Sequence, residues 1–194
     1  MLSAVRIAQS FMKECIEMGD TVVDGTAGNG NDTLFLSSCV GENGKVIAID
    51  IQEDAITSTK RMLEQHQRLN VQCIVADHSH IERELQEHRG RISCITFNLG
   101  YLPGATDHSI ITTAQSTITA LNACLELLNG KGCISVVAYR GHDHGQIEAT
   151  AVDGWMKTLP ANEWHVVSIM AINQSSLSPV VYFARRKETH SSMT

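Results

Sequence analysis

Short apolar runs alternate along the chain with longer segments in which apolar residues recur every three to four positions. The short runs are typical of buried strands, and the longer segments are typical of amphipathic helices. Strands are expected at residues 21–24, 45–50, 71–76, 92–97, 132–139, 164–173 and 179–186. Helices are expected at residues 2–18, 32–38, 53–67, 81–88, 112–128 and 146–159.

Strands that alternate with helices build a parallel sheet covered by helices on both faces. The last two strands are separated only by a Ser-rich turn at residues 174–178, which indicates an antiparallel hairpin. We therefore predict an α/β fold: a Rossmann-like, doubly wound, mostly parallel seven-stranded sheet with a C-terminal antiparallel hairpin. One domain is expected over residues 1–187, with an N-terminal helix within 1–19, followed by a frayed polar tail at 188–194.

The loop after the first strand is the most informative motif, because Asp24 precedes Gly28 and Gly30 there. Glycines between a strand and a helix let the backbone approach a nucleotide-like cofactor. A carboxylate before them would repel a pyrophosphate and attract an ammonium group. Thr33 stands where a dinucleotide-binding loop has its third glycine, and Asp32 brings negative charge to the helix N-terminus. These residues favour S-adenosylmethionine (SAM) over NAD.

Polar residues also stand at the ends of the next three strands. Asp50 ends the second strand, where a carboxylate can accept both ribose hydroxyls. Asp77 and His78 follow the third, where a carboxylate can accept from the exocyclic amine of adenine. Asn98 follows the fourth. Taken singly, each acid could be a turn or capping residue; together they predict a cleft at one sheet edge.

Four segments carry a resemblance to one family of class I methyltransferases: DGTAGNGNDT (24–33), IAIDIQ (47–52), ADHSH (76–80) and NLGYLPG (98–104). Over almost its whole length the chain is similar to the rRNA methylases of the YtqB/MnmM type. The resemblance implies the class I methyltransferase fold with SAM as cofactor. It also implies N-methylation of the amine of 5-aminomethyl(-2-thio)uridine at the wobble position of tRNA (U34).

The matched motifs imply a cofactor shell, and we assign to it Asp24, Gly28, Asn29, Gly30, Asp32, Asp50, Gln52, Asp77, His78 and Asn98. The segment from Asn98 to Tyr101 also resembles the Asn-Pro-Pro-Tyr motif of amine and amide methyltransferases, with Leu and Gly replacing the two prolines. The resemblance implies that Asn98 accepts a hydrogen bond from the target amine and that Tyr101 stacks on the base.

An amine needs a free lone pair to attack a methyl group, so a proton acceptor is expected at the cleft. Asp32, His78 and His142 are the candidates. We assign catalysis to Asn98, Tyr101, Asp32 and His142.

The loop after the fifth strand is expected to contact the substrate, because it leaves a strand end near the cleft. Arg140 could bind a phosphate, and His142 or His144 could stack on or bond a base. Together with Tyr101 and Pro103 they form the predicted substrate site. A polar solvated loop is the alternative, and no metal site is predicted because further ligands at recognisable spacing are missing. Further phosphate candidates are Arg6, Lys13 and residues 185–187.

The net charge of −6 is unusual for a protein that binds a phosphate backbone. It favours, as the alternative, N-methylation of a small amine or a protein. N-methylation of rRNA also stays open, as does, in another class, an NAD-dependent oxidoreductase or a non-catalytic nucleotide-binding module. The expected partner is the anticodon stem-loop of tRNA, with a homodimer left open. The six cysteines show no CxxC spacing, and the chain has no signal-like or membrane-spanning apolar run, so a cytoplasmic protein without membrane contact is expected.

Overall fold

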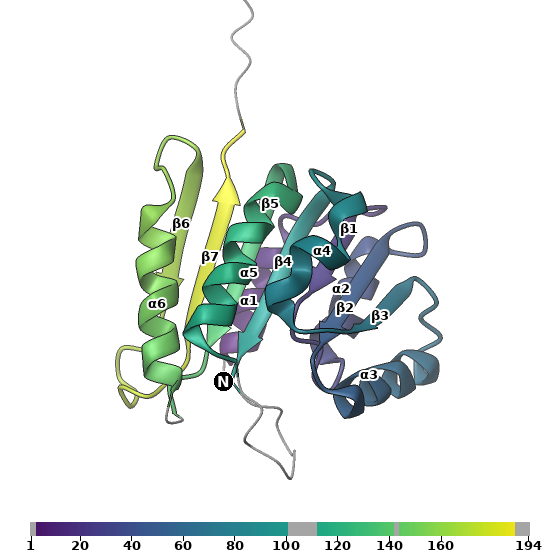
Figure 1. The fold of residues 1–194 in the computed structure, drawn as a ribbon, viewed down its shortest axis with the longest axis horizontal. Coiled ribbons are helices and arrows are strands. Elements are labelled where there is room, and N and C mark those ends of the chain that lie inside the picture. Colours follow the sequence, from purple (N-terminus) through teal and green to yellow (C-terminus); the bar gives the residue numbers. More distant parts are fainter. Residues whose placement is uncertain (1–2, 101–111, 142–143, 189–194) are drawn as a thin grey trace, which may run out of the picture.

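A seven-stranded sheet in the order β3-β2-β1-β4-β5-β7-β6 forms the centre of the computed structural model, which describes residues 3–100, 112–141 and 144–188 (Figure 1). Strands β1 to β5 pair in parallel, whereas β7 pairs antiparallel with both β5 and β6. The predicted fold class is confirmed. The strands are β1 (Thr21–Asp24), β2 (Lys45–Asp50), β3 (Val71–Val75), β4 (Ile92–Leu99), β5 (Leu128–Ala138), β6 (Trp164–Ile169) and β7 (Val180–Arg186).

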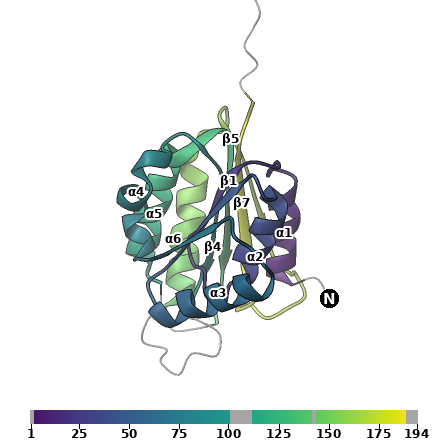
Figure 2. The same cartoon turned by 90° about the vertical axis from the view of Figure 1, so that its right-hand side faces the viewer.

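Helices cover both faces of the sheet. Figure 2 shows α1 and α2 on one face and α4, α5 and α6 on the other, while α3 packs on β2 and β3. The helices are α1 (Ala4–Lys13), α2 (Asn31–Val40), α3 (Glu53–Gln65), α4 (Ile81–Glu84), α5 (Ala114–Leu127) and α6 (Gly145–Thr158), with 3₁₀ turns at His78–His80 and Gln86–His88.

Consecutive residues of the central strands serve different cores, because side chains alternate across a strand. Val22 of β1 packs among α1 and α2, whereas Val23 joins the core beneath α5 and α6. Nearly every residue of β4 is buried, which explains its continuous apolar run. The parallel arrangement brings the C-terminal ends of β1, β2 and β4, with Asp24, Asp50 and Asn98, to one edge of the sheet.

Several element boundaries differ from the sequence prediction: β6 ends at Ile169, short of residue 173, and the helix expected at residues 81–88 is divided into α4 and a 3₁₀ turn. Helix α1 ends at Lys13, because the chain then turns and buries Ile16 in the core. Asn129 and Gly130, expected to end a long helix, lie inside β5, which begins directly after α5 at the buried Leu128. Tertiary burial of that leucine therefore outweighs the local turn preference.

The ends of the chain are described only in part. Residues 189–194 of the predicted tail lie outside the described residues, and Glu188 lies 3.4 Å from Lys131 in an ion pair. Among the helices of the described ranges, none has both the length and the apolar character needed to cross a bilayer.

Candidate active site

The loop between β1 and α2 is held by hydrogen bonds to a buried carboxylate. Asp24, which is 0% exposed, accepts from the Thr33 hydroxyl at 2.6 Å and from the Thr26 amide at 3.3 Å. Gly30 has φ +83°, and a Cβ there would lie 3.0 Å from the Cα of Thr59. Only glycine fits this backbone without strain.

Asp24 lies beneath the loop and does not line the cavity described below, and the same is true of Gly30. The predicted direct contact between Asp24 and an ammonium group of the cofactor is therefore not supported. Burial, followed by the charge of Asp32, raises the pKa of Asp24 to about 7, although the hydrogen bond from Thr33 opposes the shift. Asp24 holds the loop in shape, and Asp32 is the carboxylate of this loop region that faces the cavity.

The raised pKa predicts a pH-dependent loss of stability. An unfolded carboxyl ionises from about pH 4, whereas folded Asp24 ionises only near pH 7, so stability is lost as the pH rises through this window. The free energy of unfolding of the wild type should fall, relative to Asp24→Asn, by up to roughly 4 kcal/mol between pH 4 and pH 8. Urea titrations without SAM measure this, with Asp54→Asn on the surface of α3 as control. Parallel pH curves for wild type and Asp24→Asn would contradict it.

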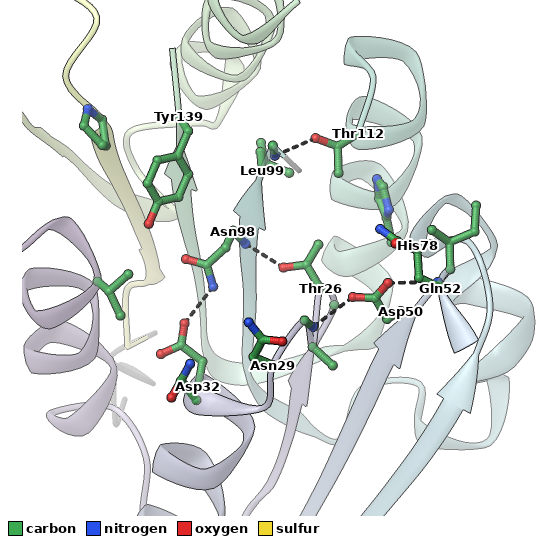
Figure 3. Close-up of a pocket in the computed structure, with 18 of the residues that line it drawn as sticks. Thr26, Asn29, Asp32, Asp50, Gln52, His78, Asn98, Leu99, Thr112 and Tyr139 are labelled. Atoms are coloured by element: carbon green, nitrogen blue, oxygen red, sulfur yellow. Dashed lines mark hydrogen bonds between the residues drawn. The ribbon is translucent and has the colours of Figure 1, made fainter. Parts of the chain in front are cut away.

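A cavity of about 670 Å³ opens at the C-terminal edge of the parallel strands (Figure 3). One part is polar and is lined by the glycine loop, Asp50, Gln52, Asp77 and His78. The other part lies around Asn98 and is lined by residues from α1, the end of β5 and the loop before β7. Its lining residues include Val5, Thr112, Tyr139, Gly141, Leu177 and Pro179.

Asp50 joins the glycine loop to the start of α3. Its Oδ2 accepts from the Gly28 amide at 2.9 Å, and its Oδ1 accepts from the Gln52 amide at 3.0 Å (Figure 3). The half-buried carboxylate still lines the cavity, so it keeps lone pairs for hydroxyl donors. Asp77 is similarly held, because its Oδ1 accepts from the Ser79 amide at 2.8 Å.

His78 is a buried, neutral imidazole at the polar part of the cavity. Burial lowers its pKa even though the Asp77 carboxylate lies 3.7 Å from Nδ1. Its ring meets the edge of the Phe97 ring at a centroid distance of 6.0 Å. Its Nε2 is buried and has no hydrogen-bond partner within the described part of the chain, so it can bond a ligand.

Asn98 lines the other part of the cavity. Its Nδ2 donates to Oδ2 of Asp32 at 2.6 Å, and its backbone amide donates to the Thr26 hydroxyl at 2.7 Å (Figure 3). Its Oδ1 is buried and lacks a partner among the described residues. Asp32 also accepts from Nε2 of Gln9 at 2.6 Å. Gln9 was not predicted; the available signal was a polar residue one helical turn after Val5.

A second buried carboxylate links α6 to the start of α5, next to the end of β4. Glu148 of α6, which is 1% exposed, accepts from the hydroxyls of Thr112 and Thr117 at 2.7 and 2.6 Å. The Thr112 hydroxyl in turn accepts from the Gly100 amide at 3.0 Å. Glu148 was not predicted, because the sequence pattern of α6 is that of an ordinary helix.

Tyr139 is the aromatic residue that the structure places in the cavity. Figure 3 shows its ring beside Asn98, with the hydroxyl directed toward the Asp32 side. It is 37% exposed, and burial, followed by the charge of Asp32, raises its pKa. The predicted stacking residue, Tyr101, lies outside the described residues, as do Pro103 and His142.

The remaining predicted substrate residues lie beside the cavity and do not line it. Arg140 donates from Nε to the Ser178 carbonyl at 2.9 Å, which holds the loop before β7. His144 is exposed and precedes α6. The basic run at residues 185–187 lies near the N-terminal end of β5, opposite to the cavity, so it is not at the cleft. There the guanidinium carbon of Arg186 lies 5.1 Å from the centroid of the Trp164 ring. Within the described ranges, no group of three or more His, Cys, Asp or Glu side chains could hold a metal ion.

The sheet order, the glycine loop and the acidic strand ends define the α/β methyltransferase class. Residues 46–185 match the family model described as "Putative rRNA methylase", and the chain belongs to this family. Residues 2–80 also match the model of protein-L-isoaspartate(D-aspartate) O-methyltransferase. The family predicted from the motifs is confirmed.

Three relatives match nearly the whole chain. A chloroplastic tRNA (mnm(5)s(2)U34)-methyltransferase of Arabidopsis thaliana is 37% identical over 95% of this chain and 70% of its own length. The rRNA-methylase structure from Clostridium thermocellum is 36% identical with a TM-score of 0.90, covering 96% of this chain and 99% of that one. A Streptococcus mutans methyltransferase in complex with SAH is 32% identical with a TM-score of 0.85 over the same shares.

Proposed function

We propose that this protein transfers a methyl group from SAM to the amine of 5-aminomethyl(-2-thio)uridine at U34 of tRNA, giving the 5-methylaminomethyl form. The observation that carries the proposal is the buried Oδ1 of Asn98, a residue that lines the cavity: this oxygen has no partner among the described residues, and the Asp32 carboxylate accepts from the amide nitrogen beside it. The chloroplastic relative, named for this modification, supports the choice of substrate.

The polar part of the cavity fits SAM. Asp50 offers carboxylate lone pairs to ribose hydroxyls, and Asp77 and His78 offer polar atoms to the adenine, including the unpaired Nε2. Gly28 and Asn29 present the loop to the remainder of the cofactor. The relative crystallised with SAH supports this assignment.

When bound, SAM supplies an electrophilic methyl group on a sulfonium. Asn98 accepts a hydrogen bond from the amine N–H through Oδ1, which directs the amine lone pair. Asp32 attracts the amine in its protonated form and lies in direct contact with Asn98. Of the proton acceptors predicted within the described residues, Asp32 is therefore the one that we propose to lie beside the amine, while His78 lines the polar part that fits the cofactor.

The part of the cavity around Asn98 receives the base. Val5, Leu177 and Pro179 give this part an apolar lining, and an apolar surrounding lowers the pKa of an alkylamine, which favours the reactive neutral form. Tyr139 offers an aromatic face for the pyrimidine. Arg140, His142, His144, Tyr101 and Pro103 are proposed to contact the anticodon stem-loop around this opening.

A labelling experiment tests the function. The protein is incubated with methyl-labelled SAM and tRNA that carries 5-aminomethyl-2-thiouridine, and the nucleosides are separated. Label is expected in the wobble nucleoside, and tRNA already methylated there should take up none. Label in rRNA, a small amine or a protein instead would support the corresponding alternative and overturn the proposal. Binding of tRNA should weaken with salt, since phosphate contacts release counterions.

The assembly and compartment are proposed on separate grounds. We propose that residues 1–187 form one domain. We also propose that the protein is cytoplasmic, because its six cysteines are free thiols and reducing compartments keep cysteines in this form. A homodimer is proposed through β6, the edge strand, because residues 164–184 include no Asp, Glu, Lys or Arg to block edge pairing. Light scattering after gel filtration decides the oligomeric state, and a monomeric mass would rule the dimer out.

A further inference from the structure

The first helix reaches into the active site through one polar side chain. Val5 of α1 lines the cavity, and Gln9, one turn later on the same face, donates from Nε2 to Oδ1 of Asp32. The contact joins residues 23 positions apart at 2.6 Å. Helix α1 packs on α2, β5 and β7, so it forms a wall of the cavity.

The hydrogen bonds on Asp32 determine which atom Asn98 presents. Both oxygens of the Asp32 carboxylate accept hydrogen bonds here, so the amide nitrogens of Gln9 and Asn98 face Asp32. Each amide uses a different oxygen, and this pair of bonds holds the plane of the carboxylate. With Nδ2 of Asn98 committed to Asp32, its Oδ1 is turned away from the carboxylate and stays unpaired.

We propose that Gln9 is a positioning residue for methyl transfer: its amide holds the Asp32 carboxylate, which in turn orients the acceptor oxygen of Asn98. The inference rests on the proposed function, in which Oδ1 of Asn98 receives the amine. Without the amide of Gln9, one oxygen of Asp32 loses its partner and the carboxylate can rotate. The amide of Asn98 then loses its single orientation, while the polar cofactor part of the cavity is untouched.

Two substitutions of Gln9 separate positioning from packing. Gln9→Ala removes the side chain, and Gln9→Glu keeps its length but replaces the amide donor with a carboxylate facing Asp32. Both should lower kcat on tRNA about 10- to 100-fold, as expected for a small misalignment of reacting groups. The KM for tRNA and the Kd for SAM should stay within about 2-fold of wild type. Ser10→Ala, on the exposed side of the same helix, is the matched control and should keep wild-type kcat.

A second readout does not depend on turnover. The side-chain amide signal of Asn98 in ¹⁵N spectra should shift in both Gln9 variants and stay in place in Ser10→Ala. Wild-type kcat in Gln9→Glu, or an unshifted Asn98 signal, would overturn the role of Gln9. So would equal losses of kcat and SAM affinity, which indicate general damage to the fold. If the wild type itself leaves U34 unmethylated, the proposed function fails. The Asn98 signal then still tests whether the hydrogen bond from Gln9 to Asp32 orients the Asn98 amide.

Discussion

Replacing Asn98 with Ala is expected to lower kcat for tRNA methylation by about 100- to 1,000-fold and to change the Kd for SAM by less than about 3-fold. The variant loses the oxygen that accepts the amine N–H, and loss of one such preorganised group typically has an effect of this size. Of the two side-chain amides bonded to Asp32 in the described part of the chain, only that of Gln9 then remains. The backbone amide of Asn98 still donates to Thr26, so the end of β4 keeps its place.

Single-turnover rates and titration calorimetry with SAM measure the two effects separately. Asn162→Ala is the matched control, because Asn162 is an exposed asparagine in the turn between α6 and β6, away from the cavity. It should match the wild type in both measurements. An equal loss of turnover and SAM affinity in Asn98→Ala would remove the role assigned to Asn98.

Replacing Asp50 with Ala is expected to weaken SAM binding by about 30- to 100-fold. A hydrogen bond to a charged group contributes about 1.5–3 kcal/mol, and Asp50 is placed to accept from ribose hydroxyls. The substitution also frees the amides of Gly28 and Gln52, which hold the glycine loop against the start of α3. At saturating SAM, kcat should fall by less than about 10-fold, because Asn98 and Asp32 are untouched.

Calorimetry of SAM binding measures this effect, with Asp54→Ala as the matched control. Asp54 is exposed in the first turn of α3 and does not line the cavity, so its loss should leave the Kd unchanged. If Asp50→Ala binds SAM as tightly as the wild type but has lost turnover, the carboxylate acts on the methyl acceptor, and the cofactor assignment is wrong.

The fold was predictable where local pattern and tertiary burial agree. Strands β1 and β2 have the bounds that their apolar runs predicted, since both are buried between helical layers. The start of β5 was missed, because Asn129 and Gly130 favour a turn locally, while the buried Leu128 and the pairing with β4 extend the strand. Local propensity loses where a sheet neighbour supplies hydrogen bonds.

The site was predictable where a residue lies at or just after the C-terminal end of a strand. Asp50, Asp77 and Asn98 line the cavity as expected, because parallel strands end at one edge. Gln9, Tyr139 and Glu148 were missed as site residues or their supports. The sequence patterns of α1 and α6 are those of ordinary helices. Tyr139 comes just before a loop in which only Arg140, His142 and His144 were predicted to contact the substrate.

The sequence by itself determined the alternation of strands and helices, the glycine loop, and the polar residues that end successive strands. These features depend on neighbours along the chain, and parallel pairing then brings the strand ends together. Only the tertiary structure decided that Asp32 faces the cavity while Asp24 lies buried, and that Asn98 presents its oxygen. The contacts of Asp32 join residues 23 and 66 positions apart, and their orientation arises only when α1, α2 and β4 pack together.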